Sequence, residues 1–366
     1  MEQTDIVYRT IYAELVQRSL DASFDAAFPP TGSFIRTTVK GRDYWYFEDR
    51  SSGMKRRYVG PAEDSAISRR IEEFGRTKEQ FRSRRRLVST LVREARFTAP
   101  DRLTGDVVEA LKRAGLFRLR AVLIGTIAFQ TYSAYLGIRL PGAIVQTGDT
   151  DFAQFYSIAN EVEDEIPSIL DVLKRVDPGF RPIPHRGDGR YTSQYINGSS
   201  YLVEFLTPNR GSDDYADKPS RMPALGDTAA QPMRFMDFLI HEPVRAVMLH
   251  GDGIPVLVPA PERYAVHKLI VANQRLSGSG IAKRDKDLRQ SRQLFEALAV
   301  ARLDRELAEV FVEAWERGPA WRDALRGGMG YLKPEDADMV SNSLAKGLDR
   351  IGRRYAEFFP DPKPAA

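Results

Sequence analysis

The chain has 366 residues, of which 42% are hydrophobic and 28% charged, an ordinary globular composition with length for two or three domains. It contains no cysteine and four histidines, which excludes disulfides, thiolate zinc sites, iron–sulfur clusters and cysteine nucleophiles. No apolar run approaches the roughly 20 residues of a transmembrane helix, and the N-terminal MEQTDIVYRT lacks the apolar stretch of a signal peptide. We therefore expect a cytoplasmic protein that does not contact a membrane.

The net charge of +4 is unevenly distributed along the chain. Residues 1–100 hold 19 lysines and arginines against 14 acidic residues, a net charge of +5, so the rest of the chain carries −1. The spacing of Arg82, Arg86, Arg93 and Arg96 places them on one face of a helix, where they could follow the phosphates of a nucleic acid. The alternative is a solvated helix face.

The first hundred residues are predicted to form a region of their own. We expect a helix over 4–20, a β-hairpin over 33–59 and a long helix over 62–96, which Ala99-Pro100 ends. The hairpin carries basic residues beside aromatic ones, a combination that suits contact with nucleic acid. A small sheet packed on the body is the alternative.

Beyond residue 100 the pattern changes to alternating strands and helices, which predicts an α+β domain over 101–260. Its helices are expected at 104–114, 128–136 and 161–175, its strands at 119–124 and 149–155, its hairpins at 191–206 and 244–258, and a long loop at 208–232. Residues 261–359 are predicted to be a helical domain, and 360–366 a disordered tail. The helices of that domain are expected at 261–275, 284–300, 303–317 and 334–358.

A pair of aspartates marks the centre of the α+β domain. Asp149 and Asp151 occupy positions i and i+2 of a predicted strand, so their side chains project from the same face. Two carboxylates held this close repel each other unless a cation lies between them, and Mg²⁺ prefers such oxygen ligands.

A third acidic residue, Glu204, lies in the otherwise apolar strand 200–206, where a carboxylate is costly unless it is paired or binds a metal. If this strand lies beside the strand of Asp149 and Asp151, the three carboxylates form a site for two Mg²⁺ ions. Such a site could activate an attacking oxygen and stabilise a leaving pyrophosphate.

A phosphate-binding turn is predicted upstream of these aspartates. Gly125-Thr126 lies where the strand 119–124 runs into a helix. Backbone N–H groups at a helix N-terminus bind phosphate, glycine permits close approach, and the threonine hydroxyl can add a hydrogen bond. One end of the segment thus suits phosphates and the other suits metal ions.

These motifs resemble the nucleotidyltransferase fold of the DNA polymerase β superfamily. Its signature is an apolar strand, Gly-Gly or Gly-Ser, a helix, Asp-x-Asp or Asp-x-Glu, and a third acidic residue on a later strand. The chain is similar to a bacterial group of uncharacterised members through Gly125–Phe129, Thr147–Ala153 and Pro261–Leu269. The resemblance covers about residues 120–290. Thr126 stands where Gly or Ser is usual, and Glu204 where aspartate is commoner.

The resemblance implies a mixed β-sheet with flanking helices and a metal-dependent enzyme, which moves a nucleoside monophosphate from an NTP such as ATP and releases pyrophosphate. The implied site residues are Asp149, Asp151 and Glu204 for catalysis and metal binding, and Gly125, Thr126, Lys268 and Lys286 for the nucleotide. Lys283 is a second candidate for the phosphates, and His267 is expected to be a structural residue that forms hydrogen bonds. One of Tyr132, Tyr135, Phe152 and Phe155 could stack on a base, although core packing is the commoner role.

Two functions of different classes are consistent with the sequence. The first is a nucleotidyltransferase whose acceptor is unidentified, with an RNA such as tRNA, held by the basic N-terminal region, as one candidate. The second is a catalytically inert nucleotidyltransferase scaffold that binds nucleic acid or serves as a toxin–antitoxin component. NTP binding that needs Mg²⁺ and Asp149 favours the first, and nucleic-acid binding independent of both favours the second.

Overall fold

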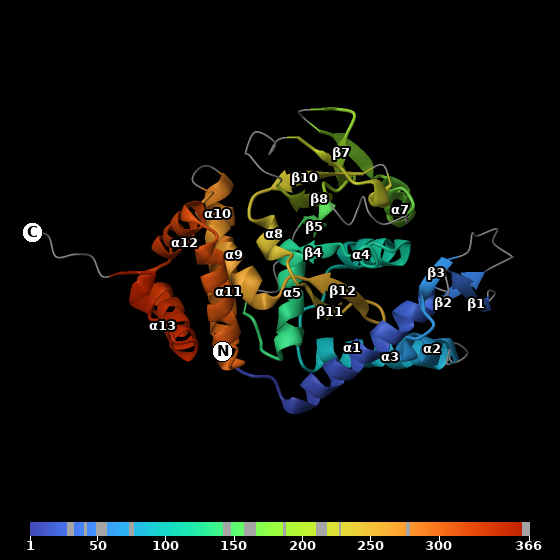
Figure 1. Ribbon diagram of the computed structural model, residues 1–366, viewed down its shortest axis with the longest axis horizontal. Coiled ribbons are helices and arrows are strands. Elements are labelled where there is room, and N and C mark those ends of the chain that lie inside the picture. The colour runs from blue at the N-terminus through green and yellow to red at the C-terminus, as the bar shows by residue number, and fades with distance from the viewer. Residues whose placement is uncertain are drawn as a thin grey trace, which may run out of the picture.

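The computed structural model describes residues 1–27, 33–39, 42–48, 57–72, 77–141, 148–156, 166–185, 188–209, 218–226, 228–275 and 279–360. Figure 1 shows a central body of strands and helices, with the C-terminal helices on one side and the small N-terminal sheet at the opposite end.

A mixed seven-stranded sheet forms the central body. Its strands are β4 (Val122–Ile124), β5 (Asp149–Ala153), β6 (Arg181–Pro184), β7 (Thr192–Ile196), β8 (Leu202–Pro208), β9 (Ser220–Arg221) and β10 (Ala229–Met233). They follow the order β4–β5–β8–β10–β9, and β7 pairs with both β6 and β8. β5 and β8 are parallel, while β4 is antiparallel to β5. A separate antiparallel hairpin is formed by β11 (Val244–Met248) and β12 (Ile254–Val258).

The alternation of side chains along β5 places the candidate site. Thr150 and Phe152 are buried, whereas Asp149 and Asp151 on the other face are half-buried. β4 is buried along its whole length, as expected for a strand that is covered on both faces. The polar face of β5 therefore meets the C-terminal end of an apolar strand.

Helices flank the sheet. These are α4 (Arg102–Ala114), α5 (Gly125–Leu136), α7 (Ile169–Val176), α8 (Met236–Leu239) and the 3₁₀ turn η2 (Pro223–Leu225). α4 has both capping signals, since the Asp101 carboxylate accepts the Thr104 N–H at 3.0 Å and Gly115 ends the helix with φ +107°. α5 starts directly at the end of β4, so the last residue of the strand is followed at once by the N-terminus of a helix.

The C-terminal helices pack on the body. They are α9 (Pro261–Ala272), α10 (Ser279–Val300), α11 (Asp304–Glu316), α12 (Pro319–Gly330), α13 (Pro334–Arg350) and the 3₁₀ turn η3 (Tyr355–Glu357). α9 lies against α10 and α12. A Cβ on Gly328 would come within 2.2 Å of the Leu269 carbonyl oxygen, so a glycine is required where α12 meets α9. One buried apolar cluster runs from the sheet into these helices.

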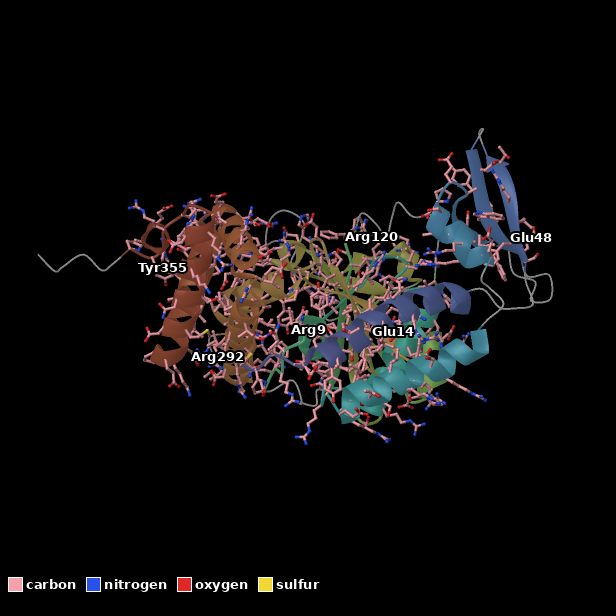
Figure 2. The ribbon with its side chains drawn as sticks, turned by 90° about the horizontal axis from the view of Figure 1, so that it is seen from below. Arg9, Glu14, Glu48, Arg120, Arg292 and Tyr355 are labelled. Carbon is pink, nitrogen blue, oxygen red and sulfur yellow. The ribbon has the colours of Figure 1, made fainter. Side chains whose placement is uncertain are left out.

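The N-terminal region combines a small sheet with two packed helices. Its elements are α1 (Ile6–Ala27), β1 (Ser33–Val39), β2 (Arg42–Glu48), β3 (Arg57–Pro61), α2 (Ser65–Glu72) and α3 (Thr77–Arg93). β1–β3 form an antiparallel sheet. α1 and α3 lie side by side (Figure 2) and share a second apolar cluster with β11, which includes Leu15, Leu91 and Val247.

The three predicted hairpins are confirmed, the first of them with a third strand. The long loop predicted over 208–232 is wrong in its last part, because β10 pairs with β8 in parallel. The Ala-Gln-Pro sequence of β10 has little strand propensity, so tertiary pairing decides its structure.

Other boundaries also differ from the prediction. The helix expected over 62–96 appears as α2 and α3, with residues 73–76 outside the described part, and α3 ends at Arg93. The helix expected over 334–358 ends at Arg350. α12 was not predicted, because its Gly-Gly-Met-Gly ending is a poor helix former, and packing on α9 overrides that preference. The predicted tail lies outside the described residues except for Pro360.

None of the helices in the described part of the chain combines the length and the apolar character that crossing a membrane requires.

We predict that Tyr12→Phe lowers the free energy of unfolding by about 1–3 kcal/mol. The Tyr12 hydroxyl accepts the backbone N–H of Val247 at 3.0 Å in a buried position, and its loss leaves that N–H without this partner. Urea unfolding measures the change. Tyr8→Phe, at a half-buried position of the same helix, is the control, and equal stability of both variants would contradict the prediction.

Candidate active site

Three carboxylates lie on adjacent strands at the centre of the sheet. In the parallel register of β5 and β8, Asp151 is directly opposite Glu204, and Asp149 is two residues before Asp151 on the same face. The structure thus brings together the three acidic residues that the sequence singled out. All three are half-buried.

The pKa of Asp151 is shifted by its burial and by the two carboxylates beside it. Burial, together with the negative charges of Asp149 and Glu204, raises the pKa of Asp151 to about 7, against the opposing effect of Lys268 and Lys286. Ionisation of this carboxyl group is therefore costly in the absence of a cation.

Glu204 has a hydrogen-bonding partner from the neighbouring strand. The Gln194 side-chain amide donates to Glu204 Oε1 at 2.7 Å, from the position directly opposite on β7. Burial raises the pKa of Glu204, while the Gln194 hydrogen bond lowers it in part. Lys283 acts on the same carboxylate by its charge, which places the start of α10 near this edge of the site.

The turn between β4 and α5 touches the carboxylates. Gly125 has φ +68°, and a Cβ on it would lie 2.6 Å from Asp151 Oδ2. Both the left-handed backbone and the close approach require glycine here. α5 begins at Gly125, so the backbone N–H groups of its first turn lie beside the Asp151 carboxylate.

Helix α9 supports this turn through a tyrosine. The Tyr264 hydroxyl donates to the Gly125 carbonyl oxygen at 2.9 Å and lies 3.0 Å from Gln290 Oε1 of α10. Tyr264 belongs to the resembling motif Pro261–Leu269, where its apolar character predicts only that the helix packs on the body. Its contact joins residues 139 positions apart, which no local pattern reveals.

A buried acidic residue of α10 organises the cations of the site. Asp287 is fully buried, and its two oxygens pair with Lys268 Nζ at 2.6 Å and with an Arg275 guanidinium nitrogen at 2.7 Å. Burial lowers the pKa of Lys268, but Tyr264 and Asp287 outweigh it and raise that pKa above its ordinary value. Lys268 is therefore a buried cation that is paired with Asp287, whereas the Arg275 side chain is about 31% exposed.

Lys286 lies at the Gly125-Thr126 turn itself. Its Nζ donates to the Thr126 hydroxyl at 3.1 Å. Burial lowers the pKa of Lys286, and the charge of Lys268 lowers it further. Lys268, Arg275 and Lys286 together face one carboxylate, Asp287, so this side of the site has a surplus of positive charge opposite the acidic strands.

A buried polar chain lies on the opposite face of β5. The Tyr201 hydroxyl donates to Thr104 Oγ1 of α4 at 3.0 Å and is hydrogen-bonded to the Thr150 hydroxyl. Thr150 stands between the two aspartates, and burial raises the pKa of Tyr201 to about 12. These hydrogen bonds link the acidic strand to α4, and they join segments too far apart in the sequence for a local pattern to predict them.

The remaining expected residues are mainly structural. Tyr132 and Phe152 are fully buried and belong to the core. Tyr135 is partly exposed at the far end of α5, away from the turn. His267 is buried, and burial lowers its pKa to about 3. Within the described residues its Nε2 has no hydrogen-bond partner, so the expected hydrogen bond is not found at that nitrogen. Thr147, part of the resembling motif, lies outside the described residues.

The donor set fits a divalent cation. Three carboxylates share one face of β5 and β8, and the pKa of Asp151 is raised. Within the described residues Asp151 forms no ion pair with a lysine or arginine. Such carboxylates are the hard oxygen ligands that Mg²⁺ takes. Another group, Asp106, Glu109 and His250, has its ligand atoms within 4.8 Å of one another. There, however, Arg102 and Arg113 already pair with the carboxylates.

Strand, glycine turn, helix and two adjacent acidic strands together define a nucleotidyltransferase fold. A family model described as nucleotidyltransferase matches residues 102–316. The chain therefore belongs to this nucleotidyltransferase family, whose members transfer nucleoside monophosphates. The match runs from α4 to the end of α11 and includes every candidate site residue. Comparisons with curated proteins and with solved structures gave no significant match.

We predict that Gly125→Ala weakens nucleotide binding at least about tenfold. The added Cβ meets Asp151 Oδ2, and the left-handed backbone costs about 1–2 kcal/mol for a non-glycine residue. Isothermal titration with a non-hydrolysable NTP analogue measures the loss. Gly148→Ala is the matched control, because its Cβ meets nothing within 4 Å. Equal affinity of the two variants would count against the turn as part of the site.

Proposed function

We propose that the protein is a Mg²⁺-dependent enzyme that transfers a nucleoside monophosphate from an NTP to an acceptor and releases pyrophosphate. One observation carries this proposal. The N-terminus of α5 stands between the acidic strands β5 and β8 and the cations of α9 and α10. An NTP with Mg²⁺ matches this arrangement, because its phosphates need cations and its metal needs carboxylates.

Asp149, Asp151 and Glu204 are the residues that would hold the metal. Bound there, Mg²⁺ would supply neutralisation of the phosphate charges and activation of the attacking oxygen. In this proposal the ion also relieves the repulsion that raises the pKa of Asp151. Glu204 would hold a second ion or accept the proton of the acceptor hydroxyl, and its hydrogen bond from Gln194 would orient the carboxylate.

The remaining residues would bind the triphosphate. The first N–H groups of α5 and the Thr126 hydroxyl would donate to phosphate oxygens, and Lys286, which already bonds Thr126, would pair with them. Lys268 would be a positioning residue that acts through its ion pair with Asp287. Direct contact between Lys268 and the nucleotide, as the resemblance implies, would require that ion pair to open.

We propose RNA as the acceptor class, supported by the net charge of +5 in residues 1–100. In the first hairpin, Lys40, Lys55 and Arg56 lie outside the described residues, and Arg36 is paired with Asp43. The described support therefore comes from α3. An inert scaffold that only binds nucleic acid is the second candidate, favoured by the same charge.

We predict that Asp151→Asn raises the melting temperature of the metal-free protein. The substitution removes one of three like charges and keeps the size of the side chain. Mg²⁺ with an NTP analogue should raise the melting temperature of the wild type but not of the variant. Differential scanning calorimetry with and without Mg²⁺ tests both effects, and a variant that still responds to Mg²⁺ like the wild type would argue against the metal site.

We predict that Lys286→Met raises the Kd for an NTP analogue about 10- to 100-fold, since a hydrogen bond to a charged group contributes about 1.5–3 kcal/mol. The Kd for the corresponding nucleoside should stay unchanged. Lys174→Met, on the exposed face of α7, is the control. Absence of any NTP binding to the wild type in the presence of Mg²⁺ would overturn the proposed function.

A further inference from the structure

Helix α3 is anchored to the body by one arginine that points inward. Arg84 is buried and pairs through its guanidinium with Asp252 in the turn between β11 and β12, with the Nε–Oδ2 distance at 3.0 Å. Val88 and Leu91 on the same helix are also buried and pack in the cluster shared with α1. The helix is therefore held by an apolar face and a buried ion pair.

The opposite face of α3 is covered with exposed arginines. Arg82, Arg86 and Arg93 form a stripe, because their spacing of four and seven residues returns to nearly the same angle around the helix. All three are exposed, and so are the flanking Arg85 and Arg96. Between positions 82 and 96 the sequence holds one acidic residue, Glu94. The stripe therefore has a large surplus of positive charge.

The stripe has the dimensions of a nucleic-acid backbone contact. From Arg82 to Arg93 the helix rises about 16 Å at 1.5 Å per residue, which equals roughly five base-pair steps. Arginine, with its planar set of donors, suits phosphate better than lysine does. Figure 2 shows α3 beside α1 at the periphery of the molecule, where a long polyanion can approach.

The surroundings of α3 favour a polynucleotide over a lipid surface. A helix that lies on a membrane turns an apolar face to the lipid, but the apolar face of α3 is packed on α1. The large hydrophobic side chains that are exposed in the described part of the chain are Ile6, Val7, Tyr135, Met233, Ile281 and Tyr331, and α3 contains none of them. Attraction at the described part of this face, from Arg82 to Arg93, is thus electrostatic.

We propose that the stripe Arg82, Arg86 and Arg93 is a binding surface for the phosphate backbone of RNA. This surface would recognise the charge and shape of the RNA backbone and would not distinguish base sequences. The choice of RNA over other polynucleotides rests on the proposed function, in which RNA is the acceptor, but the surface itself does not depend on the catalytic residues.

The test uses fluorescence anisotropy of a labelled RNA hairpin with the full chain over a series of KCl concentrations. Reversal of the stripe, Arg82→Glu with Arg86→Glu and Arg93→Glu, should weaken binding more than about tenfold and reduce the salt slope by about 2 to 3. The milder triple change to glutamine, checked by circular dichroism, guards against a folding defect. The matched control reverses three exposed arginines of the C-terminal helices, Arg305, Arg326 and Arg354.

Loss of RNA binding in the stripe variants alone supports the inference. Equal loss in the control, no RNA binding by the wild type, or preference for anionic vesicles over RNA overturns it. The proposed function is checked separately, because Asp149→Asn should abolish Mg²⁺-dependent NTP binding and leave RNA affinity unchanged. If the wild type binds RNA through the stripe but binds no NTP, the proposed function fails and the RNA surface stands.

Discussion

The repulsion among three carboxylates on two parallel strands is the constraint on which the candidate site depends. Asp149, Asp151 and Glu204 share one face because β5 and β8 pair in a single register. A slip of one residue would turn one strand's carboxylates to the buried face. The turn at Gly125 lies so close to Asp151 that a Cβ there would meet Asp151 Oδ2. The three carboxylates and the N-terminus of α5 are therefore parts of one arrangement, which a divalent cation would complete.

The C-terminal helices give that arrangement its opposite charge. Asp287 pairs with both Lys268 and Arg275, and Lys286, the residue before Asp287 on α10, donates a hydrogen bond to Thr126. Tyr264 then fixes α9 to the Gly125 carbonyl. A site with acids on strands and cations on helices suits a ligand that itself combines metal and phosphates, and the nucleotidyltransferase family match over 102–316 agrees with it.

The N-terminal region is attached by a few buried polar contacts of high sequence separation. Tyr12 accepts the Val247 N–H, and Arg84 pairs with Asp252 across 168 residues. Both contacts end on the β11–β12 hairpin, so this hairpin links the body to α1 and α3. The backbone of an arginine-rich helix held in this way is already ordered, so the binding proposed for its exposed face would cost conformational entropy only in the side chains.

The sequence alone determined the family resemblance, the turn at Gly125-Thr126 and the three acidic residues, because local patterns carry these features: a strand period of two, and a glycine between strand and helix. Only the tertiary structure decided that Glu204 stands opposite Asp151 and that Lys268 is paired with Asp287 while Lys286 reaches Thr126. It also added β10 and α12. These features depend on strand order and on packing between distant segments, which local propensity and spacing do not record.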